Sequence, residues 1–235
     1  AERVAIPVAR VAVIPEGVGF DVAATLPIAG LTAVRALELG APLRGSRVLV
    51  TGASGGVGQF AVQLAALEGA NVTAVSSRAA QHEALRALGA REVVARIDDA
   101  RDPFDLILES VGGPSLTKAI ELVGSEGVVA VFGISSEQDS TLNARTLFNK
   151  GAATIYGLLV FEEYDSGRLG ARDLERLMTL VRDGRLRSPI SLRRPWTELP
   201  ATMRELEKRE YPGKAVLEVS AMDRAGVPAV ERSEP

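Results

Sequence analysis

The residues from Arg47 to Arg78 constrain the fold of this 235-residue chain more than any other stretch. They begin with an apolar, β-branched run at 48–50, which predicts a strand buried on both faces. A glycine-rich turn at 52–58 follows, then apolar residues at helical spacing as far as Gly69, then a second strand at 71–75. A strand, turn, helix and strand within about 30 residues predict the βαβ unit that binds a dinucleotide.

The glycine-rich turn predicts where a pyrophosphate would sit. Backbone N–H groups at the start of a helix can bind a phosphate only where no Cβ intervenes. Gly55 and Gly56 would allow that approach, and Gly58 would let the helix pack closely on the strand. Because Ala53 holds the first glycine position, the turn is a variant of the G-x-G-x-x-G pattern. The alternative is a tight turn in another kind of α/β protein, which the flanking strands and helix disfavour.

The end of the second strand indicates which dinucleotide is bound. An NAD site usually carries an acidic residue here, hydrogen-bonded to the ribose 2′-hydroxyl. This chain has Ser76, Ser77 and Arg78 instead, and hydroxyls with a guanidinium suit a 2′-phosphate. The sequence therefore favours NADP(H), with a solvated arginine opening the next helix as the alternative.

The composition narrows the functional class. The net charge is −3 and there is no basic tract, so we expect neither a nucleic acid nor a membrane as a partner. No apolar run approaches the roughly 20 residues of a membrane-spanning helix, and we find no secretory signal. The absence of cysteine excludes disulfides and Cys-ligated zinc. We expect a cytoplasmic protein.

Further apolar runs extend the predicted sheet. Strands are expected at 92–95, 105–109 and 127–132, with short helices or turns between them. Five strands in this pattern predict an α/β fold with a parallel, doubly wound sheet of the Rossmann type. Ligands of such sheets bind at the carboxyl ends of the strands, so the glycine turn, Ser76, Val111 and Gly133 should lie along one rim.

The two ends and the last third give weaker patterns. Residues 1–19 hold Val/Ile runs broken by prolines, which is typical of edge strands. Further helices are expected at 21–39, 141–150, 174–184 and 196–208, and further strands at 154–160 and 213–219, with a disordered tail after them. The strand at 154–160 would leave an exposed sheet edge, which predicts a homodimer.

Four stretches in order carry a resemblance to a known family. They are AATLPIAGLTA at 23–33, VLVTGASGGVG at 48–58, DLILESVGG at 105–113 with VVAVFGIS at 128–135, and GKAVLEV at 213–219. With them the chain resembles the zinc-independent medium-chain dehydrogenase/reductases, in the quinone- and enone-reductase-like branch.

The resemblance implies a domain organisation. Members usually begin with a whole GroES-like β domain that forms one wall of the active-site cleft, and only remnants of it are expected here. Residues 1–20 would be its last strands, 21–212 the dinucleotide-binding domain, and 213–235 a returning strand and a flexible tail. The connector at 94–105 is short where relatives often carry an additional helix.

The resemblance also implies roles for residues. The pyrophosphate would lie on Ser54, Gly55, Gly56, Val57 and Gly58, and the 2′-phosphate on Ser76, Ser77 and Arg78. Val111 and Gly112 would border the ribose, while Phe132, Gly133, Ile134 and Thr32 would lie near the nicotinamide. Hydride would then pass from NADPH to a small quinone or to an activated C=C or carbonyl substrate. No catalytic residue is assigned, because relatives draw part of that site from the β domain.

Other functions are weaker alternatives. The chain could be an NADP(H)-binding module or sensor with no reductase activity of its own. A short-chain reductase would need a Tyr-x-x-x-Lys pair, which does not occur. The single histidine, His82, cannot build a metal site alone and is expected at the surface. The pair Asp98–Asp99 is expected in a solvated loop.

Overall fold

A computed structural model describes residues 5–101 and 103–219 of the chain, and its centre is one parallel sheet. Six strands lie in the order β3-β2-β1-β4-β5-β6, and every neighbouring pair is parallel. This order reverses between β1 and β4, as in a doubly wound Rossmann sheet, so the predicted fold class is confirmed. The strands are β1 (Arg47–Val50), β2 (Asn71–Val75), β3 (Glu92–Val94), β4 (Phe104–Glu109), β5 (Val123–Val131) and β6 (Thr154–Gly157).

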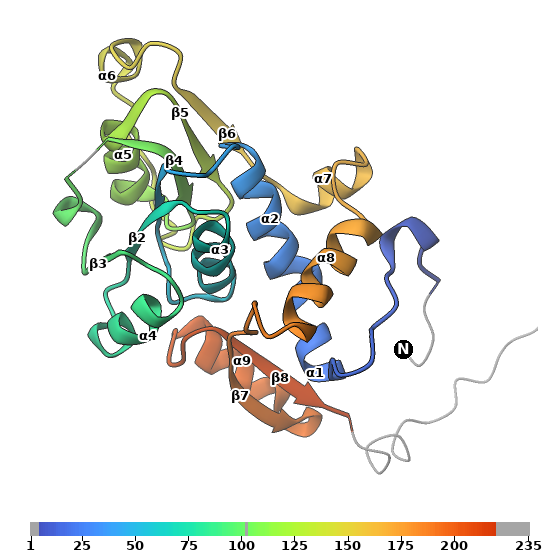
Figure 1. The fold of residues 1–235 in the computed structure, drawn as a ribbon. Coiled ribbons are helices and arrows are strands. Elements are labelled where there is room, and N and C mark those ends of the chain that lie inside the picture. Colours follow the sequence, from blue (N-terminus) through green and yellow to red (C-terminus); the bar gives the residue numbers. More distant parts are fainter. Residues whose placement is uncertain (1–4, 102, 220–235) are drawn as a thin grey trace, which may run out of the picture.

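Helices cover both faces of the sheet (Figure 1). The α-helices are α1 (Phe20–Ala23), α2 (Leu31–Glu38), α3 (Gly56–Leu67), α4 (His82–Ala87), α5 (Gly113–Leu122), α6 (Ala144–Phe148), α7 (Val160–Asp165), α8 (Ala171–Arg182) and α9 (Leu199–Glu207). Short 3-10 turns occur at Val8–Arg10, Ala79–Gln81, Ile97–Asp99 and Trp196–Glu198, and a π-helical turn at Leu26–Gly30. None of the helices in these described ranges is long and apolar enough to cross a membrane.

Side chains that point alternately to the two faces of the sheet divide the core into two clusters, one on each face. Val48 and Val50 of β1 are fully buried and pack with Phe60 of α3 on one face. Leu49, between them, points to the other face and packs with Ala119 of α5. Successive side chains of a strand point to opposite faces, so a strand covered on both sides is apolar throughout. This is why the run at 48–50 shows no alternation of polar and apolar residues.

Several boundaries differ from those that the sequence predicts. The expected strands near the N-terminus do not form in the described residues 5–19, which make only a 3-10 turn and irregular chain. Pro7 and Pro15 remove two backbone donors there, which weakens any strand ladder. The run at 154–160 is divided, because β6 ends at Gly157 and α7 begins at Val160. The helix expected at 141–150 covers only Ala144–Phe148, and the expected disordered tail lies outside the described residues.

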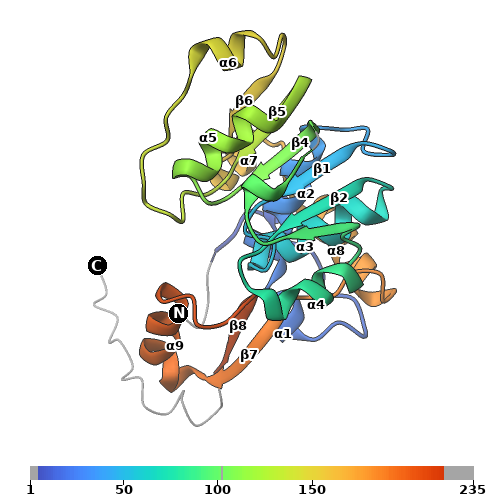
Figure 2. The same cartoon turned by 90° about the vertical axis from the view of Figure 1, so that its left-hand side faces the viewer.

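A second, two-stranded sheet lies apart from the main one. It pairs β7 (Ile190–Pro195) in parallel with β8 (Lys214–Glu218), and α9 connects them. Figures 1 and 2 both show this unit at one end of the molecule. Strand β7 was not expected, since two adjacent arginines and a proline obscure its apolar alternation. The domain boundaries expected from the sequence remain a prediction, but β7 pairs with β8 and not with the central sheet.

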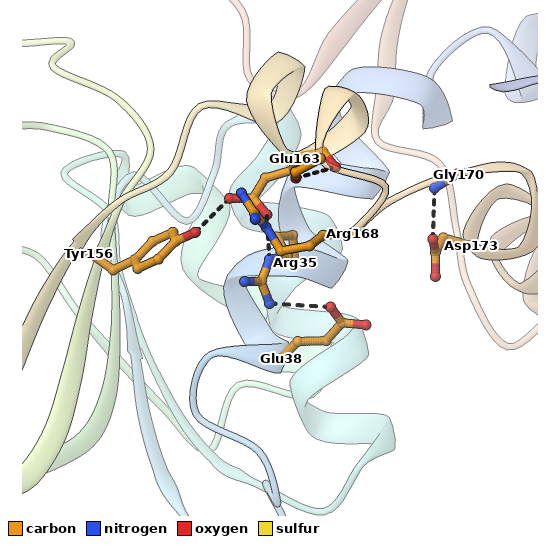
Figure 3. A network of polar contacts seen from close by, with 8 residues as sticks. Arg35, Glu38, Tyr156, Glu163, Arg168, Gly170 and Asp173 are labelled. Carbon is orange, nitrogen blue, oxygen red and sulfur yellow. Dashed lines mark hydrogen bonds and ion pairs between the residues drawn. The ribbon is translucent and has the colours of Figure 1, made fainter. Parts of the chain in front are cut away.

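One buried carboxylate joins several of these elements. Glu163 of α7 is 2% exposed and accepts hydrogen bonds from Tyr156 of β6 at 2.7 Å and from Arg35 of α2 at 2.8 Å. Arg168 forms a further ion pair with it, and Figure 3 shows the three donors converging on this carboxylate. Burial alone would raise the pKa of Glu163, but the bonds from Arg168, Tyr156 and Arg35 outweigh burial and lower its pKa to about 2. The network holds the edge of the sheet to the helices beside it.

Candidate functional site

A cavity of about 660 Å³ runs along the carboxyl ends of the central strands. Its volume falls within the range of about 300–1,000 Å³ that is usual for ligand pockets. It lies where the strand order reverses, which is where ligands bind in open parallel sheets. Ten of the residues predicted for the cofactor line it, namely Ser54, Gly55, Gly56, Val57, Gly58, Ser76, Ser77, Arg78, Val111 and Phe132.

The glycine turn between β1 and α3 forms the floor of the cavity. Gly52 has a φ of 57°, and a Cβ on it would lie 2.5 Å from the Ser110 hydroxyl oxygen. A Cβ on Gly58 would lie 2.5 Å from the Gly52 carbonyl oxygen and 2.7 Å from the Cα of Ala53. The turn can therefore keep this tight path only with glycine at these two positions.

The start of α3 is open to an anion. Gly55 is the N-cap of this helix and offers no side-chain acceptor, so no side chain satisfies the first N–H groups. These groups and the helix dipole together favour a phosphate at this place. The residues present therefore fit the pyrophosphate of a dinucleotide.

A buried carboxylate fixes the adjacent turn after β4. Glu109 is fully buried and accepts hydrogen bonds from the backbone N–H of Gly112 at 2.8 Å and of Val111 at 3.1 Å. The hydroxyls of Ser115 and Thr51 donate to it at 2.7 and 3.0 Å. This carboxylate holds Val111 at the cavity wall, a role that sequence reasoning missed because Glu109 ends an otherwise apolar strand.

The residues after β2 form the far end of the cavity. Ser76 is buried, and its hydroxyl accepts a hydrogen bond from the backbone N–H of Arg78 at 3.3 Å. The ring of His82 donates to the Ser76 carbonyl at 2.7 Å and thereby supports the turn after β2. This histidine is half-buried. The Arg78 guanidinium donates to the carbonyl of Arg209, which comes from the loop between α9 and β8.

Four predicted residues do not line this cavity. Thr32 lies within α2, is buried, and donates its hydroxyl to the Ile28 carbonyl at 2.7 Å. Gly112, Gly133 and Ile134 are neighbours in sequence of the lining residues Val111, Phe132 and Ser135, and a Cβ on Gly133 would be 2.9 Å from the Ser110 carbonyl oxygen. Their roles toward a nicotinamide remain predictions.

Other lining residues were missed because folding brings them in from distant segments. Arg96 and Asp98 come from the connector after β3, where a solvated loop was expected. Arg209 and Tyr211 come from the loop before β8, and the Arg209 guanidinium donates to the Ser135 carbonyl. The signal that the sequence offered was the positive charge of Arg96, because this residue follows β3, the strand that pairs with β2.

The described part of the chain has no group of three or more His, Asp or Glu residues that could hold a metal ion. The independence of zinc that the resemblance implies remains a prediction.

Comparison with known proteins agrees with this geometry. Residues 56–176 match the model of a family described as zinc-binding dehydrogenase. The mouse mitochondrial NAD(P)H oxidoreductase RTN4IP1 is 30% identical over 227 residues, which cover 87% of this chain and 57% of that protein. A tomato 2-methylene-furan-3-one reductase is 36% identical over 136 residues, covering 56% of this chain and 34% of the reductase.

Solved structures share the fold. A quinone oxidoreductase from Coxiella burnetii superposes with a TM-score of 0.74 at 28% identity, over 88% of this chain and 63% of that one. The chain thus spans less than two thirds of each of these relatives. The ordered motifs, the strand order and the family match agree, and the chain belongs to the zinc-binding dehydrogenase family of the medium-chain dehydrogenase/reductase superfamily.

Proposed function

We propose that this chain is the cofactor-binding part of an NADPH-dependent oxidoreductase that reduces a quinone or an activated C=C or carbonyl group. The observation that carries the proposal is a single cavity with the open N-terminus of α3 on its floor and Arg78 at its far end. A dinucleotide needs these two features, one for its pyrophosphate and the other for its adenosine end.

The cavity residues would fix the orientation of the cofactor along the rim of the sheet. The turn at 54–58 would bind the pyrophosphate, and Ser76, Ser77 and Arg78 would bind the adenosine 2′-phosphate. The nicotinamide would then extend toward Val111 and Phe132, at the ends of β4 and β5. This direction follows the rim of the sheet from β2 to β5.

When bound, NADPH would supply a hydride from its nicotinamide ring. The hydride and its electron pair would form a new bond to a substrate carbon, the π electrons of the C=C or C=O bond would move onto the carbonyl oxygen, and a proton from a donor or from water would complete the reduction. The chain would contribute orientation, because Glu109 holds Val111 at the wall through four donors. The proton donor is not assigned to any residue of this chain.

The relatives support the substrate class. The tomato protein is a reductase of an enone, the mouse protein is an NAD(P)H oxidoreductase, and the Coxiella protein is a quinone oxidoreductase. The tomato and Coxiella descriptions name conjugated oxygen compounds as substrates, whereas the mouse description names the cofactor. The mouse protein is described as mitochondrial, so the cytoplasmic compartment expected from composition stays a prediction.

The choice of NADPH over NADH is tested at Arg78. We expect Arg78→Ala to weaken NADPH binding by about 1.5–3 kcal/mol, the scale of a hydrogen bond to a charged group. NADH binding should hardly change, because NADH has no phosphate there. Isothermal titration of both cofactors into the wild type and the variant measures this, and an equal loss for both would contradict the NADPH assignment.

Turnover is tested on the same chain. The chain spans 57% of the mouse relative, and its described residues form the parallel sheet and the two-stranded unit, with no β domain as a second wall beside the cavity. We expect NADPH binding with slow reduction of quinones and enones, because substrate positioning and exclusion of water by a second wall would lower the barrier by several kcal/mol. NADPH oxidation followed by absorbance measures this. Binding without any turnover would favour the alternative, an NADP(H) module or sensor.

A further inference from the structure

The connector after β3 brings a further arginine, Arg96, to the cavity that Arg78 and Arg209 also line. Val75 of β2 pairs with Val94 of β3, and the Ser76 backbone N–H donates to the Val94 carbonyl at 3.0 Å. The residues that follow the two strands therefore leave the sheet side by side. Arg78 and Arg96 both line the cavity there.

The backbone at Arg96 is held in place by its neighbours. Its backbone N–H donates to the Asp99 carboxylate at 3.1 Å, and the next residue, Ile97, is 8% exposed and packs in the core beneath the sheet. The Arg96 side chain is 75% exposed, and the residue lines the cavity. The backbone is thus anchored, while the side chain lies at the solvent-exposed end of the cavity.

The present partner of Arg96 is easily replaced. Its guanidinium pairs with Asp98 at 3.0 Å, and that carboxylate is 54% exposed. An exposed pair of this kind contributes little to stability. A phosphate monoester carries a charge of about −1.5 to −2 and three acceptor oxygens. The phosphate would therefore compete well against the solvated Asp98 carboxylate for the N–H donors of the Arg96 guanidinium.

We propose that Arg96 is a second cation for the 2′-phosphate of NADP(H), and that it exchanges Asp98 for this phosphate when the cofactor binds. The inference rests on the proposed function and extends it by naming a specificity residue on a different strand. Arg78 and Arg96 would hold the phosphate from two sides, and Asp98 would oppose the exchange. Arg96 and Asp98 therefore have opposite effects on phosphate binding, although they form an ion pair with each other.

This opposition gives a sharp test. Adenosine 2′,5′-bisphosphate and adenosine 5′-monophosphate are titrated calorimetrically into the wild type, Arg96→Ala, Asp98→Asn and Arg86→Ala. The last variant is the control, because Arg86 is an exposed arginine of the nearby helix α4 that does not line the cavity. We expect Arg96→Ala to weaken the bisphosphate about tenfold and to change the monophosphate less than about twofold. Asp98→Asn should tighten the bisphosphate by about twofold to threefold, most clearly at low salt.

The possible results separate the claims. If both variants weaken the bisphosphate, the ion pair serves to hold the loop, and the inference is wrong. If Arg96→Ala weakens both ligands equally, the arginine contacts the adenosine and not its 2′-phosphate, which also overturns the inference. If the wild type binds neither ligand, the proposed function itself fails. If the wild type prefers the bisphosphate but Arg96→Ala has no effect, the proposed function stands and only the inference falls.

Discussion

The substitution Glu163→Gln tests how far one buried carboxylate stabilises the fold. It keeps the shape of the side chain and removes its charge. Arg35, whose side chain is 15% exposed, would lose its buried counter-charge, and one acceptor oxygen would become an NH₂ group facing donors. Removing one member of a buried pair is costly because the remaining charge stays out of water.

The magnitude follows from the pKa of Glu163. Its pKa is about 2 in the native state against an ordinary value of 4.5. At about 1.4 kcal/mol for each pH unit, this difference corresponds to about 3.5 kcal/mol of stability at neutral pH. Because the native pKa is lowered, the contribution is present above about pH 5 and is lost as the pH falls from 4.5 toward 2.

Urea unfolding followed by circular dichroism, at several values between about pH 3 and pH 7, measures the effect. We expect the free energy of unfolding of the wild type to exceed that of Glu163→Gln by about 3.5 kcal/mol at pH 7 and by less than half of that near pH 3. The control is Glu162→Gln, whose side chain is exposed, and its effect should stay within about 0.5 kcal/mol. A loss below about 1 kcal/mol, or one that does not change with pH, would refute the reasoning.

Two further predictions concern the site wall and the sheet edge. Glu109→Gln should lower the free energy of unfolding by about 2–3 kcal/mol, because an NH₂ group would face the N–H donors that the carboxylate now accepts. The same variant should weaken NADPH binding, because Val111 would no longer be held at the cavity wall. Urea denaturation measures the first effect and calorimetric titration of NADPH measures the second. Wild-type protein should also be a homodimer at micromolar concentration in light scattering, since β6 is an open sheet edge beside exposed Leu159 and Phe161. A monomer at every concentration would rule this assembly out.

The sequence predicts those parts of the fold whose signal is local. The stretch 47–78 carries its own strand, turn, helix and strand, and each element forms within a residue or two of its expected place. Gly52 and Gly58 could be assigned to the turn because tight turns favour glycine. The structure shows that neighbouring atoms leave no room for a Cβ at either position. The site residues on this stretch line the cavity for the same reason.

Features that depend on distant pairing could not be predicted in this way. Strand β7 forms because Ile190 and the residues after it pair with β8, more than twenty residues later in the chain, which no local pattern of six residues reports. Arg209 reaches the cavity only because the loop before β8 lies against the glycine turn, where Gly213 donates to the Ser54 carbonyl at 2.9 Å. Thr32 was placed near the nicotinamide by resemblance alone, and the structure buries it within α2.

The central claim is that the cavity at the strand ends binds NADPH. Calorimetric titration of NADPH and NADH into the wild-type chain tests it most directly. The account predicts saturable binding of one NADPH for each chain, tighter than NADH, with the preference reduced at high salt because part of it is exposed charge attraction. A chain that binds neither cofactor, or that prefers NADH, would contradict it.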